Sequence, residues 1–98
     1  MSTPALQQPL FSLGKIVATR GALDLLDRTG IDAMELAYRH ATGDWGAVCE
    51  ADADSNAEAV SSATRVLSSY RLGHPAETLW LITEADRSST CLLLPKEY

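Results

Sequence analysis

The chain has 98 residues, 46% of them apolar and 21% charged, and a formal net charge of -5. This length allows one domain with a single modest core, and the composition is that of a globular chain rather than a disordered one. The acidic balance and the scattered basic residues argue against direct binding of nucleic acid, and no apolar run reaches the roughly 18 to 20 residues of a membrane span.

Residues 1–9 have neither the basic start nor the apolar centre of a signal peptide, so we expect a short flexible arm there. A single globular domain then covers residues 10–98. Because no secretory signal is expected, Cys49 and Cys91 are predicted to be two reduced thiols rather than a disulfide. The sequence therefore predicts a cytoplasmic protein, without contact with a membrane.

The first predicted element is a short strand within residues 10–18. Polar and apolar residues alternate loosely there, up to the β-branched pair Ile16 and Val17. A helix is predicted to follow, because Thr19 is a candidate N-cap and Gly30 stands where a left-handed C-cap is expected. The leucines and alanines between these caps give the helix one apolar face.

The clearest local signal predicts a second helix over residues 33–40. Asp32 and Glu35 have the spacing of a capping box, with an aspartate in the cap position. Gly43 follows as the expected stop of this helix.

A third helix is predicted over residues 56–63. Ser55 and Glu58 offer a second capping box, and the alanines and valine that follow continue at helical spacing. The end of this helix is ambiguous, because the next residues fit both a helical period and a strand period. We favour a strand there, since turn residues come after it.

Three strands are predicted in the C-terminal third, over residues 65–72, 78–83 and 90–94, and Pro95 ends the last of them. Turn residues separate the strands, so we expect an antiparallel meander. The predicted fold class is a small single α+β domain. In it, the C-terminal three-stranded antiparallel meander packs against two or three short helices, with a short N-terminal strand.

No catalytic constellation is visible, and we predict neither an enzyme nor a cofactor. The chain lacks a glycine-rich phosphate loop and a Gly-x-Ser-x-Gly nucleophile motif. The residues that could bind a metal show none of the short paired spacings of a zinc site, so no metal is predicted. These candidates are His40, Asp44, Cys49, His74 and Cys91.

The net charge is concentrated in one stretch, because no lysine or arginine occurs between Arg39 and Arg65. Acidic residues in this stretch equal the net charge in number, and the remaining acids and bases cancel. Either they form a solvated face at the start of a helix, or they form a local surface that binds a basic protein partner. They are Asp44, Glu50, Asp52, Asp54 and Glu58.

Two further places leave a structural and a functional alternative open. Trp45 is either a core anchor that closes its loop or a hot spot of an interface. In the turn before the last strand, Asp86 either accepts backbone hydrogen bonds while Arg87 pairs with Glu84, or the turn is a recognition edge. In the second case Arg87 would meet a partner carboxylate or phosphate. The acidic stretch, Trp45 and this turn form the predicted partner-binding set.

Four blocks of sequence resemble a family of short proteins carried by plasmids, phages and genomic islands. In order they are FSLGKIVAT at residues 11–19, GDWG at 43–46, ITEADRS at 82–88 and LLPKEY at 93–98, so the resemblance spans nearly the whole chain. Labels of its members refer to plasmids or to restriction-modification subunits, although this chain is far too small for a methyltransferase. The link at residues 73–77 departs from the Asp-Gly turn of the family, which leaves the hairpin geometry open.

The resemblance implies a mobile-element protein, and proteins of this kind and size are often inhibitors of host defence. The first hypothesis is an anti-CRISPR or anti-restriction protein whose acidic stretch binds a basic surface of a CRISPR–Cas or restriction complex. The alternative is an accessory factor of plasmid or phage maintenance that binds a host replication or regulatory protein. A small enzyme would need a deep pocket with a shifted histidine or carboxylate. An exposed sheet edge is a further candidate for homodimerisation.

Overall fold

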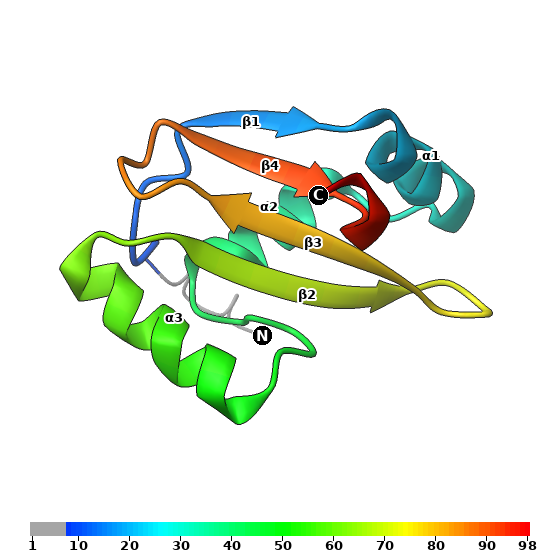
Figure 1. Ribbon diagram of the computed structural model, residues 1–98. Coiled ribbons are helices and arrows are strands. Elements are labelled where there is room, and N and C mark those ends of the chain that lie inside the picture. Colours follow the sequence, from blue (N-terminus) through cyan, green and yellow to red (C-terminus); the bar gives the residue numbers. More distant parts are fainter. Residues whose placement is uncertain (1–7) are drawn as a thin grey trace, which may run out of the picture.

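The computed structural model describes residues 8–98. The predicted flexible arm at residues 1–9 therefore lies almost entirely outside the described residues. Within them the chain forms three helices, a four-stranded sheet and a short 3-10 helix, η1 (Figure 1). In chain order the elements are β1 (Lys15–Ala18), α1 (Arg20–Thr29), α2 (Ala33–Ala41), α3 (Glu50–Ser62), β2 (Val66–Leu72), β3 (Glu77–Thr83), β4 (Ser89–Leu93) and η1 (Pro95–Glu97).

The strands form one mixed sheet in the order β1-β4-β3-β2. β2, β3 and β4 are the antiparallel meander that the sequence predicts, and β1 is the predicted N-terminal strand. Only Lys15–Ala18 of the predicted stretch is in the sheet. β1 pairs with β4 in parallel, which the chain can reach because three helices separate β1 from the meander. The predicted α+β class is confirmed.

Alternation along each strand gives the sheet one covered face and one open face. On the covered face, side chains from the sheet pack against α1 and α2, which lie behind the sheet in Figure 1. Burial of one large aliphatic side chain contributes about 1.5 to 3 kcal/mol, so this layer supplies most of the stability. Its buried side chains are Ala22, Leu25, Leu26, Leu36, Ala37, Tyr70, Leu72, Leu79, Leu81, Leu92 and Leu94.

α1 and α2 begin at the residues that the sequence marks as caps. Thr19 and Asp32 each accept a backbone N–H of the following helix with a side-chain oxygen, over 3.2 and 3.0 Å. Gly30 follows α1 with a φ of 70°, in the left-handed region that favours glycine. α2 ends at Ala41, shortly before the predicted stop at Gly43.

α3 begins at Glu50 rather than at residue 56. The predicted capping box is wrong, because Ser55 and Glu58 lie inside the helix. The N-cap is Cys49, whose side chain makes no capping hydrogen bond, so no local start signal stands at this position. Acidic residues in the first turn favour the start through the helix dipole instead.

α3 and the loop before it cover the β2 edge of the sheet. The buried Asn56 side chain donates to the Leu67 carbonyl over 2.6 Å and accepts from the Leu67 N–H over 3.0 Å. Ser69 forms backbone hydrogen bonds with residues 45 and 47. Gly46 lies between these two residues with a φ of 73°, and a Cβ there would collide with the Ser69 carbonyl. Two residues of this edge strand, Leu67 and Ser69, therefore have backbone partners outside the sheet.

Candidate protein-binding surface

Helix α3 places four acidic side chains in solvent. Glu50, Asp54 and Glu58 are four residues apart, so they form one stripe along the helix, with about 6 Å of helix rise between neighbours. Asp52 is also exposed, on another side of the same helix. Because α3 contains no basic residue, every charged side chain on it is negative.

These four carboxylates differ from most acids of the chain because they have no partner among residues 8–98. Seven of the thirteen acidic side chains accept a hydrogen bond or form an ion pair. Of the acids that do neither within the described residues, four are on α3, and the others are Asp27 and Glu35. Like charges four residues apart cost a helix about 0.2 to 0.5 kcal/mol per pair. Beyond its first turn, the stripe therefore weakens the helix while it creates a local negative field.

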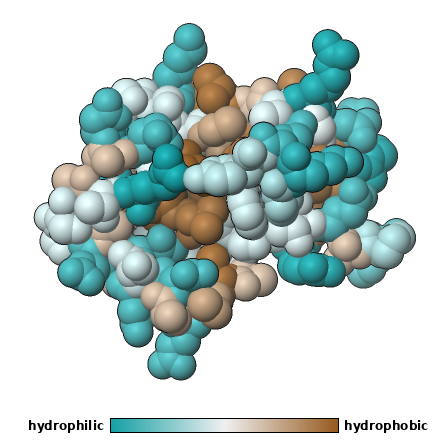
Figure 2. All heavy atoms as spheres, viewed as in Figure 1, coloured by the Kyte–Doolittle hydropathy of each residue, from teal (hydrophilic) through white to brown (hydrophobic). Residues whose placement is uncertain are grey.

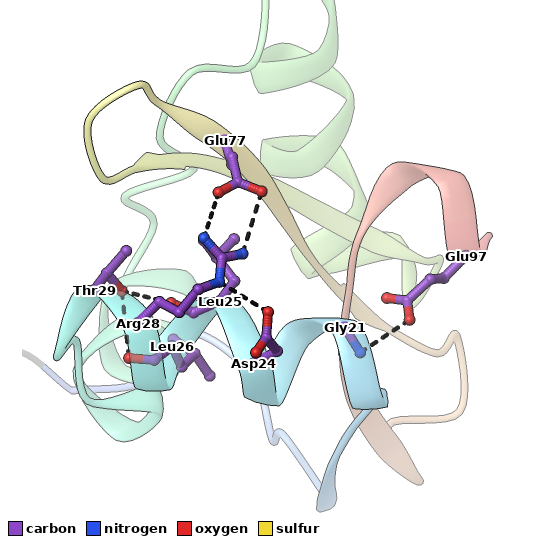
Figure 3. A network of polar contacts seen from close by, with 8 residues as sticks. All are labelled: Gly21, Asp24, Leu25, Leu26, Arg28, Thr29, Glu77 and Glu97. Carbon is purple, nitrogen blue, oxygen red and sulfur yellow. Dashed lines mark hydrogen bonds and ion pairs between the residues drawn. The ribbon is translucent and has the colours of Figure 1, made fainter.

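The network around Arg28 illustrates how the fold holds the other acids (Figure 3). The Arg28 guanidinium donates to Glu77 through both terminal nitrogens, and its Nε donates to Asp24 over 2.8 Å. The contact with Arg28 lowers the pKa of the Glu77 carboxyl and joins α1 to β3. At the start of α1, the Glu97 carboxylate accepts from the Gly21 N–H over 3.1 Å.

Arg87, in the β3–β4 turn, holds the C-terminal end of α3. Its guanidinium donates to the carbonyls of Ala59 and Thr64 over 2.9 and 2.6 Å. The predicted pairing of Arg87 with the Glu84 carboxylate is wrong. Arg87 donates to the Glu84 backbone carbonyl over 3.2 Å, and the Glu84 carboxylate lies 3.7 Å from the Arg65 guanidinium. A cation is favourable at the negative end of a helix dipole, so the Arg87 charge acts within the fold.

Asp86 and Trp45 both make the contacts that are expected if their role is structural. Asp86 accepts a hydrogen bond from the Ser88 N–H over 3.0 Å, and the contacts with Ser88 lower the pKa of the Asp86 carboxyl. The Trp45 ring stacks on Phe11 at 6.3 Å between centroids and meets the His40 ring edge-on at 6.0 Å. These contacts stabilise the turn and the loop that leads into α3.

Asp44, in the same loop, is also held by the fold. Its carboxylate accepts from Arg39 Nε over 2.6 Å and from the Gly46 N–H over 3.2 Å, and the bond to Arg39 lowers the Asp44 pKa. Its backbone carbonyl accepts from the Tyr70 hydroxyl over 2.6 Å, and burial raises the pKa of Tyr70 to about 12. Within the predicted partner-binding set, exposed acids without an internal partner are therefore confined to α3. They are Glu50, Asp52, Asp54 and Glu58.

A buried polar chain centred on His40 was not predicted. His40 Nδ1 lies 2.5 Å from the Ser68 hydroxyl, and Nε2 lies 2.9 Å from the Thr83 hydroxyl. Thr83 in turn lies 2.6 Å from Thr90, which donates to the Leu13 carbonyl over 2.8 Å. Since Thr90 has one proton and gives it to Leu13, Thr83 must donate to Thr90. His40 therefore donates from Nε2 and accepts at Nδ1, as a neutral imidazole.

The open face of the sheet carries an apolar row that crosses all four strands. Leu67, Ile82, Cys91 and Val17 stand side by side in the strand register. Figure 2 views this face and shows apolar groups gathered in its middle, among hydrophilic surroundings. Val17, at the β1 end of the row, is 39% exposed.

Two surface cavities lie near residues that an enzyme could use. One of about 540 Å³ is lined by residues that include His74 and Glu77, and one of about 370 Å³ by residues that include Glu84 and Asp86. Hydrogen bonds lower the pKa values of Glu77 and Asp86, so both are poor general bases near neutral pH. His40, whose pKa burial lowers, lines neither cavity.

The fold and this surface define a small α+β domain that presents one acidic helix beside its sheet. No family model, no curated protein and no solved structure matches the chain. Within residues 8–98, no three His, Cys, Asp or Glu side chains are placed to bind a metal together. In the same residues, no helix is long and apolar enough to cross a lipid bilayer.

Proposed function

We propose that this chain is a non-enzymatic protein of a mobile genetic element that inhibits a host defence complex of the CRISPR–Cas or restriction type. It binds a basic protein surface of that complex through the acidic face of α3. The observation that carries the proposal is that four exposed carboxylates on one helix have no partner in the part of the chain that the structure describes. The resemblance of the four sequence blocks to mobile-element proteins supports the kind of partner.

The geometry of α3 suits a basic channel better than an isolated basic residue. A helix of 13 residues is about 20 Å long, and its carboxylates follow one another along that length. In a channel lined by arginine and lysine, such a stripe takes the place of a few phosphates. Basic groups of a partner would neutralise the carboxylates. Binding would therefore remove the repulsion that destabilises α3 in the unbound protein.

The test compares two double variants with the same change of charge. Asp54→Lys with Glu58→Lys reverses the charge of the stripe, whereas Asp27→Lys with Glu35→Lys changes exposed, unpaired acids on α1 and α2. Each protein is expressed in hosts with and without one active defence system, and phage plating is counted. We expect the wild type and the α1–α2 variant to restore plating in one background, and the α3 variant to lose this effect.

Two outcomes would contradict the proposal. If no defence background shows restored plating, the protein is not an inhibitor of the systems tested. If the α3 variant inhibits as well as the wild type, α3 is not the binding surface. Recovery of a host replication or regulatory protein, and of no defence component, in pull-downs from lysate would favour a maintenance factor instead.

A further inference from the structure

The two edge strands of the sheet differ in how their outward backbone groups are paired. At the β2 edge, Asn56 pairs with the outward backbone groups of Leu67, and the loop before α3 pairs with those of Ser69. At the β1 edge, residues 8–98 supply no such partner: among the elements that they form, none lies beyond β1 in Figure 1, whereas α3 lies beside β2. An unpaired strand edge is a template for another strand, and small proteins usually protect it.

The unpaired groups on β1 can be named from its hydrogen bonds to β4. Lys15 N–H donates to the Ser88 carbonyl over 3.0 Å, and Thr19 N–H donates to the Leu92 carbonyl over 2.9 Å. Alternate residues of a strand point to alternate sides, so the residues between them turn their N–H and C=O groups outward. These residues are Ile16 and Ala18, and within residues 8–98 no hydrogen bond to their outward groups exists.

We propose that the free β1 edge pairs with the β1 edge of a second copy of this chain, antiparallel and about a twofold axis. The register that uses all outward groups places Ile16 opposite Ala18 of the second copy. Each such pair exchanges two backbone hydrogen bonds. The axis then passes beside Val17, which faces Val17 of the second copy in a pair without hydrogen bonds.

The side chains on the open face favour a second copy over an unrelated strand. In a pair without hydrogen bonds the side chains approach most closely, so the two Val17 side chains would cover each other's exposed surface. The apolar row of one copy, which ends at Val17, would continue directly into the row of the other. A self-complementary edge of this kind is what a twofold interface requires.

The charges are compatible with this dimer. Lys15 would lie opposite Thr19 of the second copy, not opposite another lysine. The acidic helix α3 lies at the other edge, and seven strand spacings of about 4.8 Å place the two β2 strands, beside which the α3 helices lie, about 34 Å apart. This separation exceeds the Debye length of about 8 Å at physiological salt, so repulsion between the two acidic surfaces is screened. The dimer leaves α3 accessible and does not depend on the proposed function.

The contact is short, and a four-residue edge buries less than the roughly 1,200 Å² of a stable interface. We therefore expect a weak dimer in rapid exchange. Sedimentation equilibrium from about 10 µM to about 1 mM should show the mass rising from 10.6 kDa toward twice that value. At the highest concentration, exchange of the Ile16 and Ala18 amide hydrogens should slow several-fold relative to the lowest one.

Val17→Lys is the decisive variant, because it places two cations opposite each other at the axis. It should remain monomeric at every concentration, whereas Met34→Lys, which changes an exposed apolar residue on α2, should dimerise like the wild type. A wild type that stays monomeric at the highest concentration would overturn the proposal. So would a dimer that Val17→Lys does not weaken, or one that leaves the Ile16 and Ala18 amides unprotected.

Discussion

His40 is fully buried, and both of its ring nitrogens are in hydrogen bonds that suit the neutral form. Burial, with a smaller contribution from the Arg87 charge, lowers the pKa of His40 to about 4. Protonation would put a second donor opposite Ser68 and a positive charge near Arg87. The residue therefore stabilises the fold only as long as the imidazole stays neutral.

The free energy of unfolding should fall when the pH is lowered from 7 to 5. An unfolded histidine binds a proton near pH 6.5, whereas His40 in the folded state does so only near pH 4, so protons favour unfolding between these values. The expected loss is about 2 kcal/mol over this range. It is measured by urea unfolding at both pH values.

His40→Gln should flatten this pH dependence, whereas His74→Gln, at an exposed position, should preserve it. If the free energy of unfolding falls by the same amount between pH 7 and 5 in the wild type and in His40→Gln, the buried imidazole is not the source of the pH dependence.

Stability should depend on the geometry of the Arg87 guanidinium and not only on its positive charge. Arg87→Lys keeps the cation but cannot bond the carbonyls of Ala59 and Thr64 in the same way. We expect a loss of about 1 to 3 kcal/mol, measured by thermal unfolding followed at a helix signal. Arg71→Lys, on the exposed β2–β3 hairpin, is the matched control, and an equal loss in both variants would argue against a cap on α3.

At the scale of the elements, Asn56 connects α3 to the β2 edge. Asn56→Ala leaves both backbone groups of Leu67 without their partner, which should cost about 1 to 3 kcal/mol. Ser55→Ala is the control, since Ser55 lies in the exposed helix interior and alanine is favourable there. Equilibrium denaturation of both variants checks this. If Ser55→Ala lost the roughly 1 kcal/mol of a removed N-cap, the helix would begin where the sequence first suggested.

The starts of the helices with side-chain caps could be predicted from the sequence, and the start of α3, which has no such cap, could not. Thr19 and Asp32 start their helices with hydrogen bonds to residues two or three positions away. The interaction that fixes each start therefore lies within a short stretch of sequence and can be recognised there. Cys49 makes no capping bond, and α3 begins there because the loop and the β2 edge hold it in place. The box at Ser55 and Glu58 therefore misplaced the start.

The candidate surface was only partly predictable for a similar reason. The acidic stretch was visible as composition, but the sequence does not show which carboxylates have partners. Asp44 is bound by Arg39, five residues away, while Arg87 reaches carbonyls more than twenty residues away. Such long-range contacts separate the residues used by the fold from those that remain free. The chain of Ser68, His40 and Thr83 likewise joins three elements and has no local pattern.

Across the whole molecule, the negative charge is arranged asymmetrically, at one edge of the sheet. Added sodium chloride should therefore stabilise the wild type, because it screens repulsion within α3. The expected gain is about 0.5 to 1 kcal/mol between low and moderate salt, from two like-charge pairs. Asp54→Lys with Glu58→Lys should show a smaller gain in the same unfolding experiment, and an equal gain would place the repulsion elsewhere.

The bonds that Asn56 makes to Leu67 also limit how the molecule can assemble. A sheet with two free edges can add copies at both sides without end, as fibres do, whereas a sheet with one free edge is complete after a single addition. Loss of the Asn56 amide would therefore do more than weaken α3. Without it, the backbone groups of Leu67 would be unpaired at the second edge, although the bonds of Ser69 to residues 45 and 47 would remain. The side chain that stabilises one copy therefore also hinders the addition of a further strand at this edge.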